Sequence, residues 1–141
     1  MSDADRHHYR GGCLCGAIRY TADGPPLASG VCYCRDCQYA CGGAPAHGLR
    51  LRRDRVALVA GEPRIFRGTS AAGNQVARHF CGECGTPLFV ASEAAPRLLS
   101  VLAGSLDDPS RFQPGGSLWV DSAQPWHEVD PELPQWTGSA L

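Results

Sequence analysis

The sequence lacks any apolar run long enough to cross a membrane, which takes roughly 20 consecutive apolar residues. Its opening residues are polar and acidic, without the apolar segment of a secretory signal. We therefore expect a cytoplasmic protein with no membrane partner.

A strong charge of either sign is also missing. The 141 residues carry a net charge of -1; 19% of them are charged and 43% are hydrophobic. The thirteen basic residues are all arginine, but they form no stripe with interleaved aromatic residues, so nucleic acid is not an expected partner. The sequence makes no prediction about the oligomeric state.

A third absence is helical periodicity. No segment repeats apolar residues at the 3.6-residue spacing of a long helix, and 17 Gly and 11 Pro interrupt the chain at short intervals. This pattern predicts a mainly β protein of short strands joined by turns. Because the length suits one domain, we expect a single domain over 9–137, a flexible tail over 1–8 and another tail over 138–141.

Alternation and turn residues place the individual elements. A short helical turn is expected over 35–40, and an irregular strap over 123–136. The expected strands lie within residues 17–20, 27–34, 44–52, 56–60, 64–67, 75–80, 86–90, 98–103 and 118–120.

Eight cysteines are the most informative feature that is present. In a reducing compartment, cysteines at C-x-C and C-x-x-C spacing favour metal ligation over four disulfides. Cys13 and Cys15 would present two thiols on one face of a strand, and Cys81 and Cys84 form a knuckle with intervening glycine. Together these two pairs can complete a closed, tetrahedral structural zinc site.

The remaining thiols belong to Cys32, Cys34, Cys37 and Cys41. Three thiolates with an open fourth position are typical of a catalytic zinc, whereas four make a second structural site. The spacing leaves both interpretations open. It also allows another partition, in which the pairs 13/15 and 32/34 share one ion and the pairs 37/41 and 81/84 share the other.

Five motifs follow one another along the chain, and in this order they resemble the glutathione-dependent formaldehyde-activating (GFA) family, which includes centromere protein V. The resemblance is to the shorter members of that family, and it spans residues 9–137. The motifs are residues 12–20 (GCLCGAIRY), 32–38 (CYCRDCQ), 80–88 (FCGECGTPL), 104–109 (GSLDDP), and Pro125-Trp126 with Leu133-Pro134.

The resemblance implies a β-tent fold of short antiparallel strands with two zinc ions per chain. It implies structural zinc ligands at positions 13, 15, 81 and 84, and active-site zinc ligands at Cys32, Cys34 and Cys37, with Cys41 as a non-ligand. The implied activity is the addition of glutathione to formaldehyde, classed in reverse as a carbon–sulfur lyase, so the expected partners are a small thiol and an aldehyde. The sequence departs from the family pattern at Tyr33, where His is common.

Other residues near the cysteines are candidates for supporting roles. His47 is a candidate proton carrier, while Tyr33 and Asp36 are candidates for positions beside the metal ligands. The alternative hypothesis is a non-catalytic, zinc-stabilised binding module with two structural zinc sites, because a fold does not by itself imply an activity.

Overall fold

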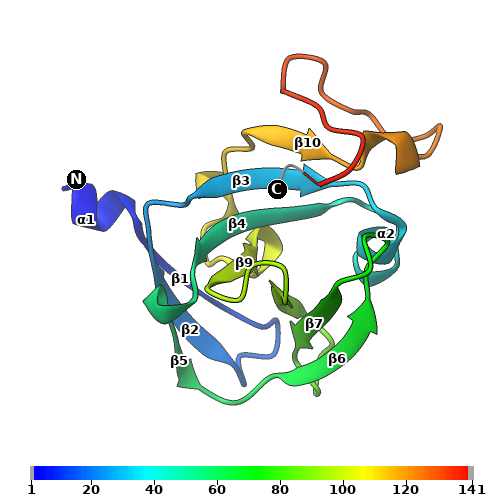
Figure 1. Cartoon of the computed structure of the whole chain (residues 1–141). Coiled ribbons are helices and arrows are strands. Elements are labelled where there is room, and N and C mark those ends of the chain that lie inside the picture. Colours follow the sequence, from blue (N-terminus) through cyan, green and yellow to red (C-terminus); the bar gives the residue numbers. More distant parts are fainter. Residues whose placement is uncertain (1, 140–141) are drawn as a thin grey trace.

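Strands dominate the computed structural model, which describes residues 2–139, and the predicted mainly β fold is confirmed (Figure 1). Part of the tail predicted over 138–141 therefore lies outside the described residues. The strands are β1 (His8–Gly12), β2 (Arg19–Asp23), β3 (Ala28–Cys32), β4 (Ala46–Arg52), β5 (Val56–Ala60), β6 (Arg64–Thr69), β7 (Gln75–Phe80), β8 (Pro87–Ser92), β9 (Leu98–Leu102) and β10 (Gly116–Leu118). The helical elements are α1 (Asp3–Arg6), α2 (Arg35–Ala40), and the 3₁₀ turns η1 (Arg53–Arg55), η2 (Ala103–Ser105), η3 (Pro109–Arg111) and η4 (Val120–Ser122).

Two sheets make up the domain. One has three strands in the order β1-β2-β5, and the other has seven in the order β10-β3-β4-β9-β8-β7-β6. All pairs are antiparallel except β10 with β3, which are parallel. No helix among the described residues is long and apolar enough to cross a membrane.

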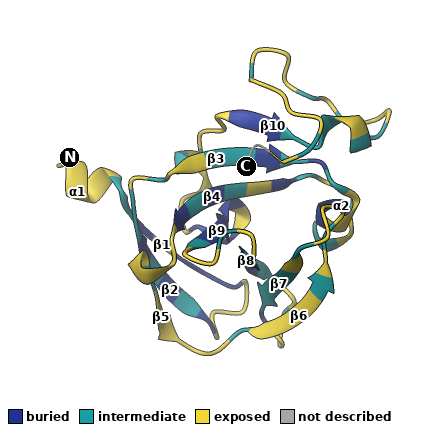
Figure 2. Cartoon of the chain, in the orientation of Figure 1, coloured by how far each residue is buried: buried dark blue, intermediate teal, exposed yellow. Residues whose placement is uncertain are grey.

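The seven-stranded sheet has a different environment on each face, because side chains alternate along a strand. One face packs against the β1–β2 hairpin and forms the main core, which includes Tyr20, Leu49 and Phe89. The other face carries a smaller cluster built on Cys37, with the buried residues Ala46 and Leu102. The buried centre of the molecule, around β4, β8 and β9, is visible in Figure 2.

The short helix α2 follows β3 and lies over the smaller cluster. Its N-cap is Cys34, whose sulfur accepts a hydrogen bond from the Cys37 backbone N–H at 3.4 Å. It ends at Ala40 with Cys41 as its C-cap, after which Gly42 and Gly43 take positive φ angles of 66° and 95°. The helical turn predicted over 35–40 is confirmed, and the glycines explain why it stops there.

Two segments differ from the sequence-based expectation. The strand predicted over 118–120 is wrong beyond Leu118, because Trp119 is left-handed (φ 55°) and η4 follows it. The predicted flexible tail over 1–8 contains α1 and the first residue of β1. The guanidinium of Arg111 fixes this segment by donating to the backbone carbonyls of Asp5, Arg6 and His8.

Candidate metal centres

Four cysteines meet where the β1–β2 hairpin approaches the turn between β7 and β8. The sulfur atoms of Cys13, Cys15, Cys81 and Cys84 all lie within 4.8 Å of one another. We call this group the four-cysteine cluster. Cys15 and Cys81 are 66 residues apart in sequence, yet their sulfurs are 3.8 Å apart. The cluster therefore joins the two sheets at one point.

Hydrogen-bond donors surround these sulfurs. The Ile18 backbone N–H donates to Cys13 Sγ at 3.2 Å, and the Glu83 N–H donates to Cys81 Sγ at 3.4 Å. The Thr86 hydroxyl, 3.2 Å from Cys84 Sγ, lowers the pKa of that thiol to about 5. Because zinc binds thiolates, four sulfurs this close together and surrounded by hydrogen-bond donors fit a structural zinc ion.

The second group is the three-cysteine cluster of Cys32, Cys34 and Cys37, whose sulfurs also lie within 4.8 Å of one another. Cys32 ends β3, Cys34 caps α2, and Cys37 lies in the first turn of that helix. Hydrogen bonds from Cys32 and Cys37 lower the pKa of Cys34 to about 2, and the bond to Cys34 raises the pKa of Cys32 to about 11. Thiols this close share protons, and a bound cation would take the protons' place, so this set also fits zinc.

Cys41 lies one turn beyond Cys37 and is not part of the group whose sulfurs come within 4.8 Å of one another. Its backbone N–H donates to the Cys37 carbonyl at 2.9 Å, and burial raises the pKa of its thiol. Among the described residues, the structure thus brings three cysteines together at this centre, and it does not form the alternative partition of the pairs.

An arginine that the sequence analysis did not single out lies against the three-cysteine cluster. The two terminal nitrogens of Arg78, in β7, are 3.9 and 3.8 Å from Cys37 Sγ. Burial opposes the charge of this guanidinium, but Cys37, Cys34 and Asp36 together outweigh it, and the pKa of Arg78 is raised. The signal in the sequence is weak, since Arg78 is one of thirteen arginines and is 41 residues from Cys37.

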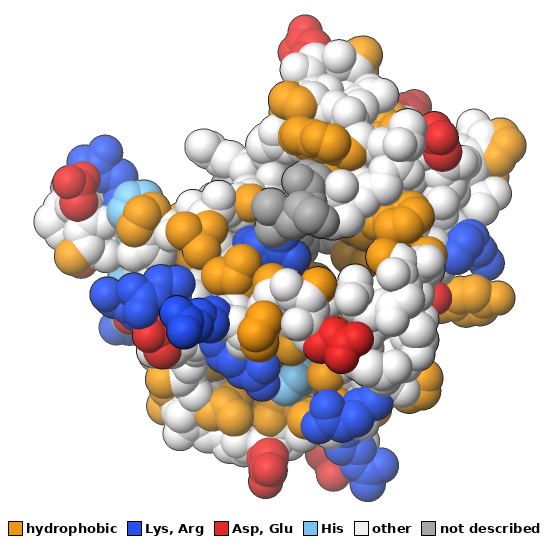
Figure 3. Space-filling model, viewed as in Figure 1, with side chains coloured by type: hydrophobic (Ala, Val, Ile, Leu, Met, Phe, Trp, Pro, Cys, Tyr) orange, Lys and Arg blue, Asp and Glu red, His pale blue; other side chains and the backbone are white. Residues whose placement is uncertain are grey.

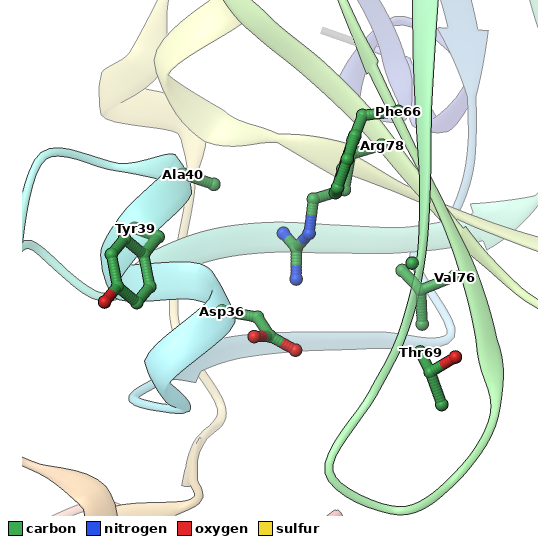
Figure 4. A pocket seen from close by; sticks show the side chains of 8 residues that line it. Asp36, Tyr39, Ala40, Phe66, Thr69, Val76 and Arg78 are labelled. Atoms are coloured by element: carbon green, nitrogen blue, oxygen red, sulfur yellow. The ribbon is translucent and has the colours of Figure 1, made fainter.

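A cleft of about 500 Å³ opens beside the cluster, between α2 and the β6–β7 hairpin. Figure 4 shows Asp36 and Arg78 reaching into this gap from opposite sides. Its aromatic lining residues are Tyr39, which is 79% exposed, and Phe66, which is 62% exposed. The cleft is connected to the three-cysteine cluster through Arg78, which lines it and whose terminal nitrogens contact Cys37 Sγ.

The side chains of His47 and Tyr33 make their contacts away from the three-cysteine cluster. Ala46 packs against the cluster, so the next residue of β4, His47, faces the other side of the sheet, with its ring 5.8 Å from that of Phe112. Tyr33 is buried, and its hydroxyl donates to the Glu128 carbonyl at 3.3 Å. The structure therefore does not bring these two side chains to the sulfurs, whereas Asp36 lines the adjoining cleft.

Basic side chains gather elsewhere on the surface, as the lower half of the face in Figure 3 shows. A second hollow, of about 380 Å³, includes Arg53, Arg67 and His79 in its lining. Cross-strand register places His79 on the sheet face opposite Arg78, so this hollow is separate from the cysteine cleft.

Comparisons with known proteins agree with this arrangement. Residues 8–122 match the family model described as "Glutathione-dependent formaldehyde-activating enzyme". A Halomonas elongata protein named "Putative glutathione-dependent formaldehyde-activating enzyme" is 30% identical over 129 residues, which cover 85% of this chain and 80% of that protein. A crystal structure of a Rhodobacter sphaeroides protein has the same fold, with a TM-score of 0.58, 18% identity, and coverage of 90% of this chain and 98% of that one. The chain belongs to the glutathione-dependent formaldehyde-activating enzyme family.

Proposed function

We propose that this protein is a zinc-dependent enzyme of the carbon–sulfur lyase class, which adds a glutathione-like thiol to a small aldehyde such as formaldehyde or reverses that addition. The observation that carries the proposal is the three-cysteine cluster beside an open cleft, with the fourth nearby cysteine, Cys41, outside the group of sulfurs. The names of the family and of its Halomonas relative point to the same substrates.

The reaction itself needs no redox partner. The thiol sulfur forms a bond to the aldehyde carbon, the carbon–oxygen π bond becomes a single bond, and the proton of the thiol ends on that oxygen. A zinc ion held by Cys32, Cys34 and Cys37 would supply the Lewis acid that lets a thiol bind as its thiolate near neutral pH.

Residues of the chain fix the positions of the sulfurs and of the substrate. Cys34 and Cys37 are fixed by the start of α2, which sets the spacing of the sulfurs. The cleft walls at Tyr39 and Phe66 hold the organic part of the substrate and orient it, and such positioning accounts for a large part of many enzymatic rates. Arg78 lines the same cleft and supplies positive charge beside it.

The four-cysteine cluster is a second centre, and its proposed role is structural. Its four sulfurs satisfy a tetrahedral ion without leaving room for substrate, so we assign it to structure. All eight cysteines are free thiols, which suits the reducing conditions of the cytoplasm that we propose as the location.

The test is the exchange of formaldehyde with glutathione, followed by NMR exchange spectroscopy on zinc-loaded protein. We expect the wild-type protein to accelerate this exchange and Cys34→Ser to abolish the acceleration. Serine is also a good N-cap, so this variant removes the sulfur while α2 keeps its cap. Cys41→Ser is the matched control and should keep the activity.

If the wild-type protein with two bound zinc ions leaves the exchange rate unchanged for glutathione and for smaller thiols, the enzyme proposal is wrong. Two zinc ions that do not respond to added thiol would then favour the binding module with two structural sites.

A further inference from the structure

We infer that Arg78 makes the three-cysteine cluster selective for an anionic ligand on its cleft side. This inference rests on the proposed function for the presence of zinc, and it adds a residue and a charge preference to that site. Arg78 is a positioning residue in this account, since it acts through the electrostatic environment of the sulfurs.

The register of the sheet fixes where Arg78 points. Arg78 pairs with Phe66 of β6 on one side and with Val90 of β8 on the other, so its backbone is held between two neighbouring strands. Cross-strand partners face the same side of a sheet, and Val90 packs against the three-cysteine cluster. The guanidinium therefore emerges on the cysteine side, where both terminal nitrogens contact Cys37 Sγ.

The charge of the cluster explains why this contact matters. Three thiolates around a divalent ion carry a net charge of −1, so an anionic fourth ligand would bring the centre to −2. A guanidinium 3.8 Å from one of the sulfurs offsets one unit of that charge. A neutral ligand adds no charge and gains much less from the guanidinium.

Arg78 is available for this role because it forms no ion pair with a carboxylate in the part of the chain that the structure describes. Among residues 2–139, the ion pairs involve other basic residues, at positions 6, 8, 19 and 52. Asp36 lines the same cleft and adds some opposing negative charge, but it is exposed and forms no ion pair with Arg78. The apolar side chains of Val76 and Ala40 in the lining reduce solvent screening around the guanidinium.

The experiment compares ligands of different charge on the cobalt-substituted protein, whose visible spectrum reports ligand binding at the metal. Thiocyanate serves as the anionic probe and imidazole as the neutral probe. We expect Arg78→Gln to weaken thiocyanate binding roughly tenfold and to change imidazole binding less than about twofold. Arg78→Lys keeps the charge and should retain most of the thiocyanate affinity.

Arg67→Gln is the matched control, because Arg67 lies on the neighbouring strand but lines the separate hollow on the other face. It should leave both affinities unchanged. Metal content and the melting temperature of each variant check that both cysteine clusters remain loaded and folded.

Equal weakening of both probes in Arg78→Gln, or no change in either, would overturn the inference. The proposed function fails separately, by the absence of thiol–aldehyde exchange. A protein that discriminates by charge but does not accelerate exchange would keep the role of Arg78 and lose the enzyme assignment.

Discussion

The side-chain amide of Gln38, in α2, donates a hydrogen bond to the backbone carbonyl of Ser122, 84 residues later, at 2.9 Å. The same nitrogen donates to the Tyr33 carbonyl at 2.7 Å, and Gln38 is only 1% exposed. Its oxygen accepts from Gln124, in the strap over 123–136. One buried amide therefore fastens the C-terminal segment to the helix that carries Cys37.

Replacing Gln38 with leucine should destabilise the protein by about 2–4 kcal/mol, because the buried Tyr33 carbonyl and the partly buried Ser122 carbonyl would both lose their donor. Urea unfolding of the zinc-loaded protein measures this change. Gln75→Leu is the control: its amide bonds Thr69 on the surface, so the expected change is within about 0.5 kcal/mol. Equal losses in the two variants would contradict a role for the buried amide.

The two cysteine clusters should differ in what they contribute to folding. Cys84→Ser should lower the zinc content from two to one and destabilise the domain by several kcal/mol, since a structural zinc site contributes binding energy directly to folding. Cys37→Ser should also lose one zinc but retain most of the fold, because its cluster involves only α2 and the end of β3. Metal analysis and circular dichroism distinguish these outcomes, and a larger loss of structure in Cys37→Ser would reverse the assignment.

Cys41→Ser should retain two zinc ions, because the Cys41 sulfur is not in the group that lies within 4.8 Å. The stability change should be no more than about 1 kcal/mol, as expected for a partly buried residue of similar size. Loss of one ion on this substitution would show that Cys41 is a ligand, and would make both centres closed sites.

The turn after α2 offers a matched pair of glycines. A Cβ on Gly42 would meet no atom within 4 Å, whereas one on Gly43 would lie 3.2 Å from the ring of Trp126. Both have positive φ, so alanine at either position should cost about 1–2 kcal/mol through backbone strain. Thermal unfolding should show a larger loss of stability for Gly43→Ala than for Gly42→Ala. In a Trp126→Ala background, this difference between the two glycine variants should become smaller. If Gly43→Ala is still more destabilising than Gly42→Ala when Trp126 is absent, the difference comes from backbone strain alone.

A pH-dependent contribution is expected from Asp107, whose pKa is lowered mainly by the hydrogen bonds from Arg19 at 2.9 and 2.5 Å. A carboxyl group with a lowered folded-state pKa stabilises the protein above its unfolded pKa of about 3.9, and this stabilisation disappears as pH falls through the folded value. Asp107→Asn should therefore cost less than about 1 kcal/mol at pH 7, since the pair is partly exposed. Unfolding curves of the two proteins should converge in acid; a constant difference down to pH 3 would contradict the ionic contribution.

Local patterns in the sequence were sufficient for several elements. The helical turn over 35–40 and the strands over 56–60 and 75–80 have the predicted bounds, because glycine, proline and alternating apolar residues mark their ends. The cysteine spacing likewise suggested the two groups of sulfurs that the structure brings together. These features were predictable because they depend on residues that are close together in the sequence.

Features that depend on tertiary contacts were not predictable in the same way. The left-handed conformation of Trp119 interrupts an apolar segment that resembles a strand, and the structure forms η4 instead. The placement of Arg78 beside Cys37 depends on β7 and α2 lying on the same side of one sheet. His47 is close to the cluster in sequence, but its side chain lies on the opposite face because one step along β4 reverses the direction of the side chain.

Side chains alternate between the two sheet faces along β7, so a change in the length of this strand would change which residues face the cysteine sulfurs. Arg78 faces the cysteine sulfurs, while the next residue, His79, places its ring 6.0 Å from Phe89 of the main core. Inserting or deleting one residue within this strand would exchange the two positions, which would move a guanidinium to the face that carries Arg53 and Arg67 and withdraw it from the sulfurs. Tolerated length variation in this hairpin should therefore concentrate in the turn at 70–74, where an added residue leaves the pairing of Arg78 with Phe66 intact.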